Sequence, residues 1–289
     1  MTGAAQIALL ADGRRLHLNH GPIDIVALAE GDEAEVMVAY SQAGVRFATI
    51  LDELVTELPR LRAPVGAARP LLNGAVARRM VAAVWPHRDA FVTPMAAVAG
   101  AVADDVLGAL VAGRDLSRVY INNGGDIAIH LATGQSFDAG IVDDADAPAI
   151  DARVRLAQNM PVRGLATSGW RGRSHSLGIA DAVTVLARSA AEADVAATLI
   201  ANRVDVDHPA IRRAPANTLS DDSDLGDLPV TVAVGELPDD AVERALAAGL
   251  AHASVIQAKG HIFSAYLSLQ GRVITLTAEA RLSAARGVA

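Results

Sequence analysis

Short apolar runs broken by turn residues open the chain. Residues 6–28 are mostly apolar, and the pairs Asp12-Gly13 and Gly21-Pro22 interrupt them. Pairs of this kind are typical of tight turns between strands. The first part of the chain is therefore predicted to form two or three antiparallel strands.

The pattern changes to a helical period at Asp32. Apolar residues recur at helix-like spacing up to Leu58, and Pro59 and Pro64 are expected to end this helix. The apolar positions that carry the pattern are Val36, Tyr40, Phe47, Leu51 and Leu54. Similar patterns predict helices over residues 73–84, 94–111 and 238–259, and a further helix that opens near Glu192.

Glycine pairs mark predicted hairpins in the second half of the chain. In residues 118–131 two strand-like runs flank the sequence NNGGD, whose glycines permit the positive φ of a tight turn. A last hairpin is expected to turn at Gln270-Gly271. Further strands are predicted for residues 137–142, 154–156, 183–187 and 229–234. Two acidic segments separate them: residues 143–151, a linker, and Asp221, Asp222, Asp224 and Asp227, a loop that is expected to be solvated rather than to hold Ca²⁺.

Composition indicates a globular protein with a large core. Of the 289 residues, 52% are hydrophobic and 20% are charged, which predicts one domain over residues 1–289 or two interleaved lobes. A signal peptide and an uncharged apolar stretch of about 18 residues are both missing from the pattern, so we expect a cytoplasmic protein with no membrane partner. The chain has no cysteine, which excludes disulfides, thiolate metal sites and a cysteine nucleophile.

Charge and motif content exclude several functional classes. The net charge of −8 argues against nucleic acid as a partner. Lys259 is the only lysine and does not lie in a phosphate loop, and no GxGxxG stretch is found. Ser168 lacks the preceding glycine of a GxSxG nucleophile turn. A small anionic ligand bound by a local basic loop remains compatible with the sequence.

The clearest candidate for metal chemistry lies in residues 164–202. Asp194 and Thr198 are four residues apart on the predicted helix and share one face, so their oxygens suit a hard cation such as Mg²⁺. The structural alternative is an exposed acidic residue that suits the helix dipole and contributes little to stability, with Thr198 packed in the protein.

Two further segments are candidates for binding a ligand. The glycines of NNGGD expose backbone amides that can approach a phosphate or a ring, with Asp126 beside them; a plain turn is the alternative. A predicted Thr-Ser turn at residues 166–169 leads into a loop with Trp170, Arg171 and Arg173. The arginines suit a phosphate or carboxylate, and the indole suits a ring, unless the loop is only a solvated surface.

In sequence order, five segments of the chain resemble the motifs of the ApbE-like flavin transferase superfamily. They are AGAVAD (residues 99–104), NNGGDI (122–127), ATSG (166–169), SHS (174–176) and ADVAAT (193–198). The resemblance covers about residues 90–202. Within the superfamily the chain looks most like an uncharacterised subfamily, uncharacterised protein family 0280.

The resemblance implies an α/β (α+β) fold with mostly antiparallel sheets packed against helices. It also implies an enzyme that binds FAD with Mg²⁺ and transfers FMN to a threonine of a target protein. Asp194 and Thr198 would hold the metal, and His175 would occupy the position of the family's histidine, where a neutral imidazole takes a hydroxyl proton. The flavin-contacting residues would be Asn123, Gly124, Gly125 and Asp126, with Thr167, Ser168 and Gly169 in the same pocket.

Two departures from the family pattern keep a second reading open. Ala99 stands where the transferases have lysine, and the segment D-P-x-T-G after the histidine is absent. Arg171 and Arg173 would then compensate for the missing charge. One hypothesis is therefore a divergent Mg²⁺-dependent enzyme that transfers FMN or cleaves a pyrophosphate bond. The other is a binding protein for flavin or a small anion on the same scaffold. A target protein and a homo-oligomer stay open as partners.

Overall fold

The computed structural model describes residues 3–141, 152–172, 174–221 and 223–277. Two compact units interleave along the sequence. Unit 1 comprises Met1–Ser136, Ala157–Ala166 and Ala187–Val195, and unit 2 comprises Phe137–Leu156, Thr167–Leu186 and Ala196–Ala289. One domain over the whole chain stays a prediction.

Unit 1 is built on an antiparallel sheet. Its strands follow one another as β1 (Gln6–Leu9), β2 (Leu16–His20), β3 (Ile23–Gly31), β4 (Leu116–Asn123), β5 (Asp126–Leu131) and the first residues of β8 (Gly164–Ser168). The predicted hairpin is confirmed: β4 and β5 pair from Asn123 with Asp126, and the two turn glycines have φ of +68° and +109°. Glycine adopts both angles at little cost because it lacks a Cβ.

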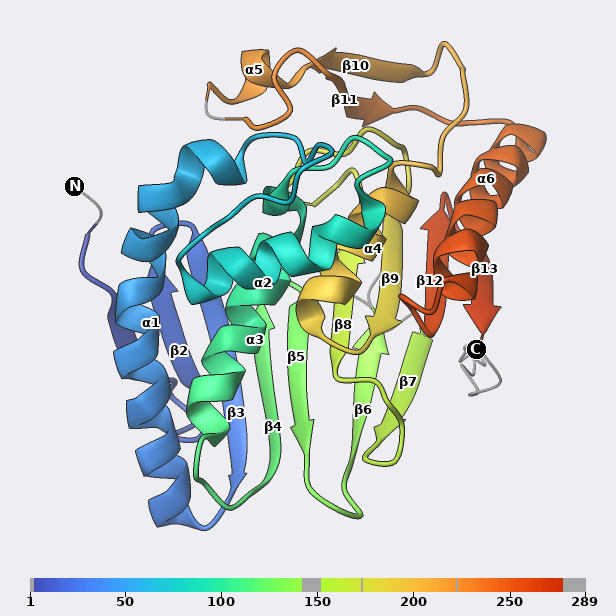
Figure 1. The fold of residues 1–289 in the computed structure, drawn as a ribbon. Helices are drawn as coiled ribbons and strands as arrows, with labels where there is room; N and C mark the ends of the chain where they lie inside the picture. The colour runs from blue at the N-terminus through green and yellow to red at the C-terminus, as the bar shows by residue number, and fades with distance from the viewer. Residues whose placement is uncertain (1–2, 142–151, 173, 222, 278–289) are drawn as a thin grey trace. The chain divides into compact units, whose positions relative to one another are not determined.

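Helices cover one face of this sheet (Figure 1). They are α1 (Glu33–Leu61), α2 (Ala75–Val84), the short turns η1 (Trp85–His87) and η2 (Pro94–Ala97), α3 (Val98–Val111), and the start of α4 (Ala190–Ala201). Helix α1 packs against α3 and β3, and α3 lies on β4 and β5. The small buried residues Gly100, Ala101 and Ala103 let other backbone come close to α3.

The end of α1 differs from the prediction. The helix was expected to end before Pro59, but it continues to Leu61, with Pro59 inside its last turn. Proline removes one amide donor from a helix and its ring crowds the carbonyl four residues earlier, so other contacts must offset this cost. Leu61 is fully buried, and the Arg62 amide donates to the Leu58 carbonyl, so packing and a closing hydrogen bond hold the last turn.

The described residues of unit 2 form three small groups of strands. β9 (Ala182–Ala187), β12 (Ser264–Leu269) and β13 (Arg272–Thr277) are antiparallel neighbours in that order, and α6 (Asp239–Ala258) packs on β12 and β13. The other two groups are β6 (Ser136–Ile141) with β7 (Ala152–Ala157), and β10 (Ile211–Pro215) with β11 (Pro229–Val234). The sequence pattern missed β10 and the short α5 (Ala216–Leu219). The fold is therefore α/β with mostly antiparallel sheets, as predicted.

The two acidic segments are only partly described. Residues 143–151 and Asp222 lie outside the described residues. In the second segment, Asp227 accepts a hydrogen bond from the Asn217 side chain at 2.6 Å, a contact within the protein.

One helical stretch of the described residues, Pro94–Val111, is apolar and long enough to cross a membrane, with a mean hydropathy of 1.5. It is not an uncharged apolar stretch, because it contains Asp104 and Asp105. Both carboxylates bind groups of unit 1: Asp104 accepts the amide of Ala190, and Asp105 pairs with Arg46. Buried and paired in this way, the stretch has the character of a core helix.

Replacing Gly100 by alanine is expected to destabilise the protein by about 2–3 kcal/mol, because overpacked sites shift their neighbours. An ideal Cβ at Gly100 would lie 2.3 Å from the Ala190 carbonyl oxygen, and backbone there cannot move freely. Gly108→Ala on the same helix is the matched control. Nothing lies within 4 Å of its added Cβ, so a gain of about 0.5–1 kcal/mol is expected. Urea denaturation measures both, and equal stabilities would contradict the close contact.

Candidate functional site

Helix α3 is capped by a residue from a different helix. Its own N-cap residue, Ala97, offers no side-chain acceptor to the first amides. Instead, Oδ2 of Asp194 on α4 accepts the amide of Gly100 at 3.0 Å. The free amides at a helix start need such acceptors, and the positive end of the helix dipole favours a carboxylate. Asp194 therefore serves as the missing cap of α3.

Asp104 on α3 caps the start of α4 in the same way. Oδ1 of Asp104 accepts the amide of Ala190, and Oδ2 accepts the amide of Ala191, both at 3.0 Å. The next amide, that of Glu192, donates to the Ser189 hydroxyl at 3.2 Å. The first three amides of α4 are thus all bound by side chains. Each helix caps the start of the other.

These contacts close a ring in unit 1. Gly100 and Asp104 are one helical turn apart on α3, and Ala190 and Asp194 are one turn apart on α4. The two helices touch through backbone at Gly100, where no side chain separates them. A shift of either helix would break the hydrogen bonds at both starts, so the ring fixes where the Asp194 carboxylate lies.

Burial shapes the electrostatics of the ring. It raises the pKa of Asp194 to about 7, and the nearby charge of Asp104 adds to the rise, while the amides of Gly100 and Ala99 oppose it. Burial also raises the pKa of Asp104, helped by Glu192 and opposed by the Ala191 and Ala190 amides. The expectation of an exposed helix-start aspartate is therefore wrong. Asp194 is a partly buried carboxylate that neighbouring protein encloses.

The predicted NNGGD turn is attached to the same backbone. Asn123 is only 4% exposed, and its Nδ2 donates to the Ala99 carbonyl at 3.0 Å. The Gly125 amide donates to Oδ1 of Asn122 at 2.8 Å, and a Cβ at Gly125 would meet nothing within 4 Å. The structure thus brings two predicted residues, Asn123 and Asp194, to neighbouring residues of α3. The glycine side of the turn is open.

A second cluster of predicted residues lies in unit 2 around Asp181, which the sequence pattern missed. Oδ1 of Asp181 accepts Nε1 of Trp170 at 3.1 Å and Nε of Arg171 at 3.2 Å. Its Oδ2 accepts the Gln270 amide at 2.6 Å, and the Arg171 guanidinium lies 4.6 Å from the centre of the Trp170 ring. Arg171 is therefore not a free cation, because Asp181 already offsets its charge.

The remaining predicted residues of unit 2 have different surroundings. Thr167 and Ser168 end strand β8 rather than form a turn, and the Thr167 hydroxyl bonds that of Thr184 at 2.8 Å. Gly169 packs so tightly that a Cβ would lie 2.2 Å from the Asp181 carbonyl oxygen. His175 is exposed, and Arg173 lies outside the described residues.

Asp194 and Thr198 lie one turn apart on α4, as predicted for a metal pair. No group of three His, Cys, Asp or Glu side chains converges on a metal position in the described part of the chain. A cation there would need water or backbone oxygens as further ligands. Glu192 has a buried Oε2 without a partner, and Arg79 is the cation that acts on Asp104. Hard carboxylate and hydroxyl oxygens suit Mg²⁺.

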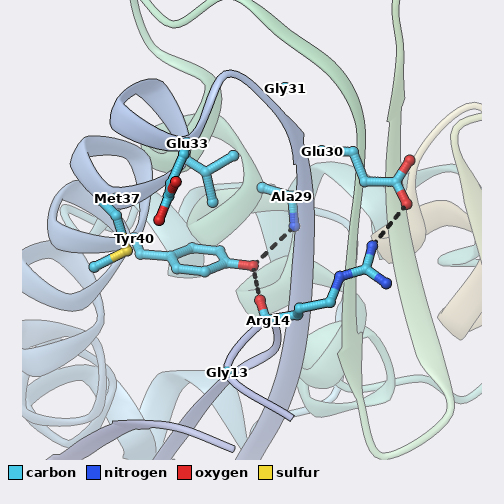
Figure 2. A pocket seen from close by; sticks show the side chains of 9 residues that line it. Gly13, Arg14, Ala29, Glu30, Gly31, Glu33, Met37 and Tyr40 are labelled. Atoms are coloured by element: carbon cyan, nitrogen blue, oxygen red, sulfur yellow. Dashed lines mark hydrogen bonds and ion pairs between the residues drawn. The ribbon is translucent and has the colours of Figure 1, made fainter.

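Two cavities in unit 1, of about 530 and 540 Å³, contain none of the predicted site residues. The first lies where β3 leads into α1 (Figure 2). Tyr40 points across it, donating to the Arg14 carbonyl at 2.6 Å and accepting the Ala29 amide at 3.0 Å. Glu30 at its rim is paired with Arg14 and Arg118. These polar groups satisfy one another, which is the arrangement of a structural contact.

Comparison with known proteins identifies the family. The model of the family described as AbpE bacteria matches residues 7–275. The chain belongs to this family. The resemblance seen in the sequence motifs is therefore confirmed at the level of the family.

The relatives include UPF0280 proteins of methanogens. Identity is 38% over 147 residues to that of Methanopyrus kandleri, covering 50% of this chain and 56% of the relative. It is 34% over 193 residues to that of Methanosphaerula palustris, covering 66% and 77%. In the first of these matches the chain spans about half of the relative's length. The crystal structure of apo Pseudomonas stutzeri flavinyl transferase ApbE matches with a TM-score of 0.45 at 13% identity, over 96% of both chains.

The protein without divalent cations is expected to lose stability as the pH rises from about 4 to about 7, because Asp194 binds its proton more tightly when folded. Its folded pKa of about 7 exceeds the ordinary 3.8, so the contribution is present below pH 3.8 and is lost as the pH passes about 7. One such group changes the unfolding free energy by at most about 1.4 kcal/mol per pH unit.

Urea denaturation at several pH values measures this slope, with Asp194→Asn as the control. Burial lowers the pKa of His252, which gives a slope of the opposite sign in both proteins. The difference between the two curves therefore reports the titration of Asp194 and its coupling to Asp104. Parallel curves would show that the Asp194 pKa is not raised.

Proposed function

We propose that the chain is a divergent, Mg²⁺-dependent ApbE-like enzyme of the cytoplasm that acts on FAD or a related nucleotide. The observation that carries the proposal is the carboxylate group at the start of α4. Asp104, Glu192 and Asp194 place more negative charge there than Arg79 offsets, and burial raises the pKa of both aspartates. A buried site with this imbalance favours a bound cation. Family membership supports flavin chemistry as the reaction type.

In the proposed reaction, each residue has a separate role. Asp194 and Thr198 hold Mg²⁺, and the turn at Gly124 and Gly125 approaches the nucleotide. The bound ion supplies positive charge that offsets the charge of the pyrophosphate. A threonine hydroxyl of a target protein attacks the phosphorus on the FMN side, and the bond from that phosphorus to the oxygen of AMP breaks. His175 takes the hydroxyl proton. With water in place of threonine, the same cleavage yields free FMN.

The second candidate is a binding protein for flavin or a small anion. Two observations favour it. Ala99 provides no charge where the transferases have lysine, and the Arg171 charge is already offset by Asp181. Both features reduce the positive charge that these two positions offer to a pyrophosphate.

Incubation of the protein with FAD and Mg²⁺ is expected to release AMP, and Asp194→Asn is expected to reduce that release by about 100-fold or more, since metal and its ligand offset charge in the transition state. Chromatography of AMP and FMN measures the reaction, with and without a threonine-containing candidate target. Asp239→Asn, an exposed carboxylate at the start of α6, is the control and should leave the rate unchanged. Equal rates in both variants would exclude the metal role of Asp194.

Binding without turnover is tested through Trp170. The chain has two tryptophans, so Trp85→Phe leaves Trp170 as the only indole reporter. FAD is expected to quench its fluorescence if a ring stacks on the indole. Quenching without AMP release would favour the binding protein, and unchanged fluorescence would remove Trp170 from the ligand site.

A further inference from the structure

We propose that Asp104 is a positioning residue that sets the cation affinity of Asp194, although it does not itself bind the cation. The inference rests on the proposed function, in which Asp194 is a metal ligand. It assigns to a carboxylate on α3 control over a ligand on α4.

Asp104 holds the start of α4 through two hydrogen bonds. Its two oxygens accept the amides of two successive residues, Ala190 and Ala191, both at 3.0 Å. A bidentate contact to neighbouring amides fixes both the position and the rotation of the first turn. Asp104 does so from a partly buried position in unit 1, so losing this acceptor would leave two amides with poor access to solvent.

The position that Asp104 imposes on the first turn of α4 also determines the position of the proposed metal ligand, Asp194. Asp194 lies one turn after Ala190, so its Cα moves with the turn that Asp104 holds. Gly100 abuts the Ala190 carbonyl, which leaves no space in which α4 can shift toward α3. The Asp194 carboxylate therefore meets the Gly100 amide in one orientation, with the remaining oxygen lone pairs in a fixed direction. Metal affinity falls when a ligand loses the group that orients it.

Asp105 provides a control that distinguishes the positioning role of Asp104 from a general contribution to stability. Asp105, the next residue of α3, has a carboxylate that is only 10% exposed and is paired with Arg46 at 2.6 Å. That pair ties α3 to α1, and Asp105 also lies 3.9 Å from Nη2 of Arg79 on α2. Removing the charge of Asp105 disturbs the same helix but leaves in place the Asp104 oxygens that accept the first amides of α4. It is the matched control for Asp104.

Titration of the full chain with Mn²⁺ at pH 8, followed by calorimetry, tests the inference in the wild type, Asp104→Asn and Asp105→Asn. Asparagine cannot accept both amides, because one of its two terminal atoms is a donor. We expect Asp104→Asn to weaken Mn²⁺ binding by about 10–100-fold. Asp105→Asn should keep the wild-type Kd even where its melting temperature falls.

The possible outcomes separate this inference from the proposed function. Equal affinity of Asp104→Asn and the wild type would overturn the role of Asp104 while leaving the metal site intact. An equal loss in Asp105→Asn would reduce the effect to general stability and overturn the role as well. A wild-type protein that binds no Mn²⁺ would overturn both the inference and the metal part of the proposed function.

Amide exchange in the wild type decides the matter if Asp104→Asn does not fold. Coupling between two sites is reciprocal, so a cation on Asp194 must strengthen the contacts of Asp104 in turn. Mg²⁺ is expected to slow exchange at the amides of Ala190 and Ala191 more than at Ala193, whose amide donates to the Ser189 carbonyl. Unchanged exchange at Ala190 and Ala191 in the presence of bound Mg²⁺ would overturn the inference.

Discussion

The reciprocal capping of α3 and α4 is the constraint on which unit 1 depends. Both helices are rich in alanine and apolar residues. Helix α3 has no side-chain cap of its own, and the Ser189 hydroxyl accepts only one of the first amides of α4. An unpaired buried amide costs about 1–3 kcal/mol, so several at one junction would exceed what small residues gain by packing. Asp104 and Asp194 resolve this in trans, and the absence of a side chain at Gly100 brings the helices close enough for both caps to form. The Asn123 side chain then attaches the glycine turn to the same backbone.

This solution places two carboxylates in a region that disfavours charge. The helix amides stabilise the ionised forms, but burial outweighs them, and the pKa of each carboxyl rises. Such a group either takes up a proton near neutral pH or attracts a cation. The same feature that caps the helices therefore creates the demand for positive charge on which the proposed function rests. Asp104 and Asp194 contribute both to stability and to the proposed chemistry. A change at Asp194 would therefore affect the stability of the protein as well as its proposed reaction.

The fold was predictable from local patterns, whereas the site was predictable only in part. Turn glycines fixed the hairpin around Gly124, and helical spacing predicted α1, α2, α3 and α6 within a turn, because both signals lie within short segments. The role of Asp104 has no such signal. Its partners are 86 and 87 residues away in sequence, and that of Asp194 is 94 away, so the rules for residues on one helix do not apply. Its one local sign is a pair of acidic residues, Asp104 and Asp105, on a helix that is otherwise apolar. Asp181 escaped notice for the same reason, since its contact with Gln270 spans 89 residues.

The departures from the family motifs acquire a physical meaning from these contacts. A lysine at position 99 would bring a cation beside the cap of α3, where its charge would stabilise the ionised form of Asp194. Alanine leaves that carboxylate with only amides and a raised pKa. Arg171 does not replace the missing charge without cost, because any anion that it binds must compete with Asp181. In the proposed reaction the metal ion would therefore supply most of the charge that a pyrophosphate requires. It follows that nucleotide binding should depend more strongly on the divalent cation here than in a relative that keeps the lysine.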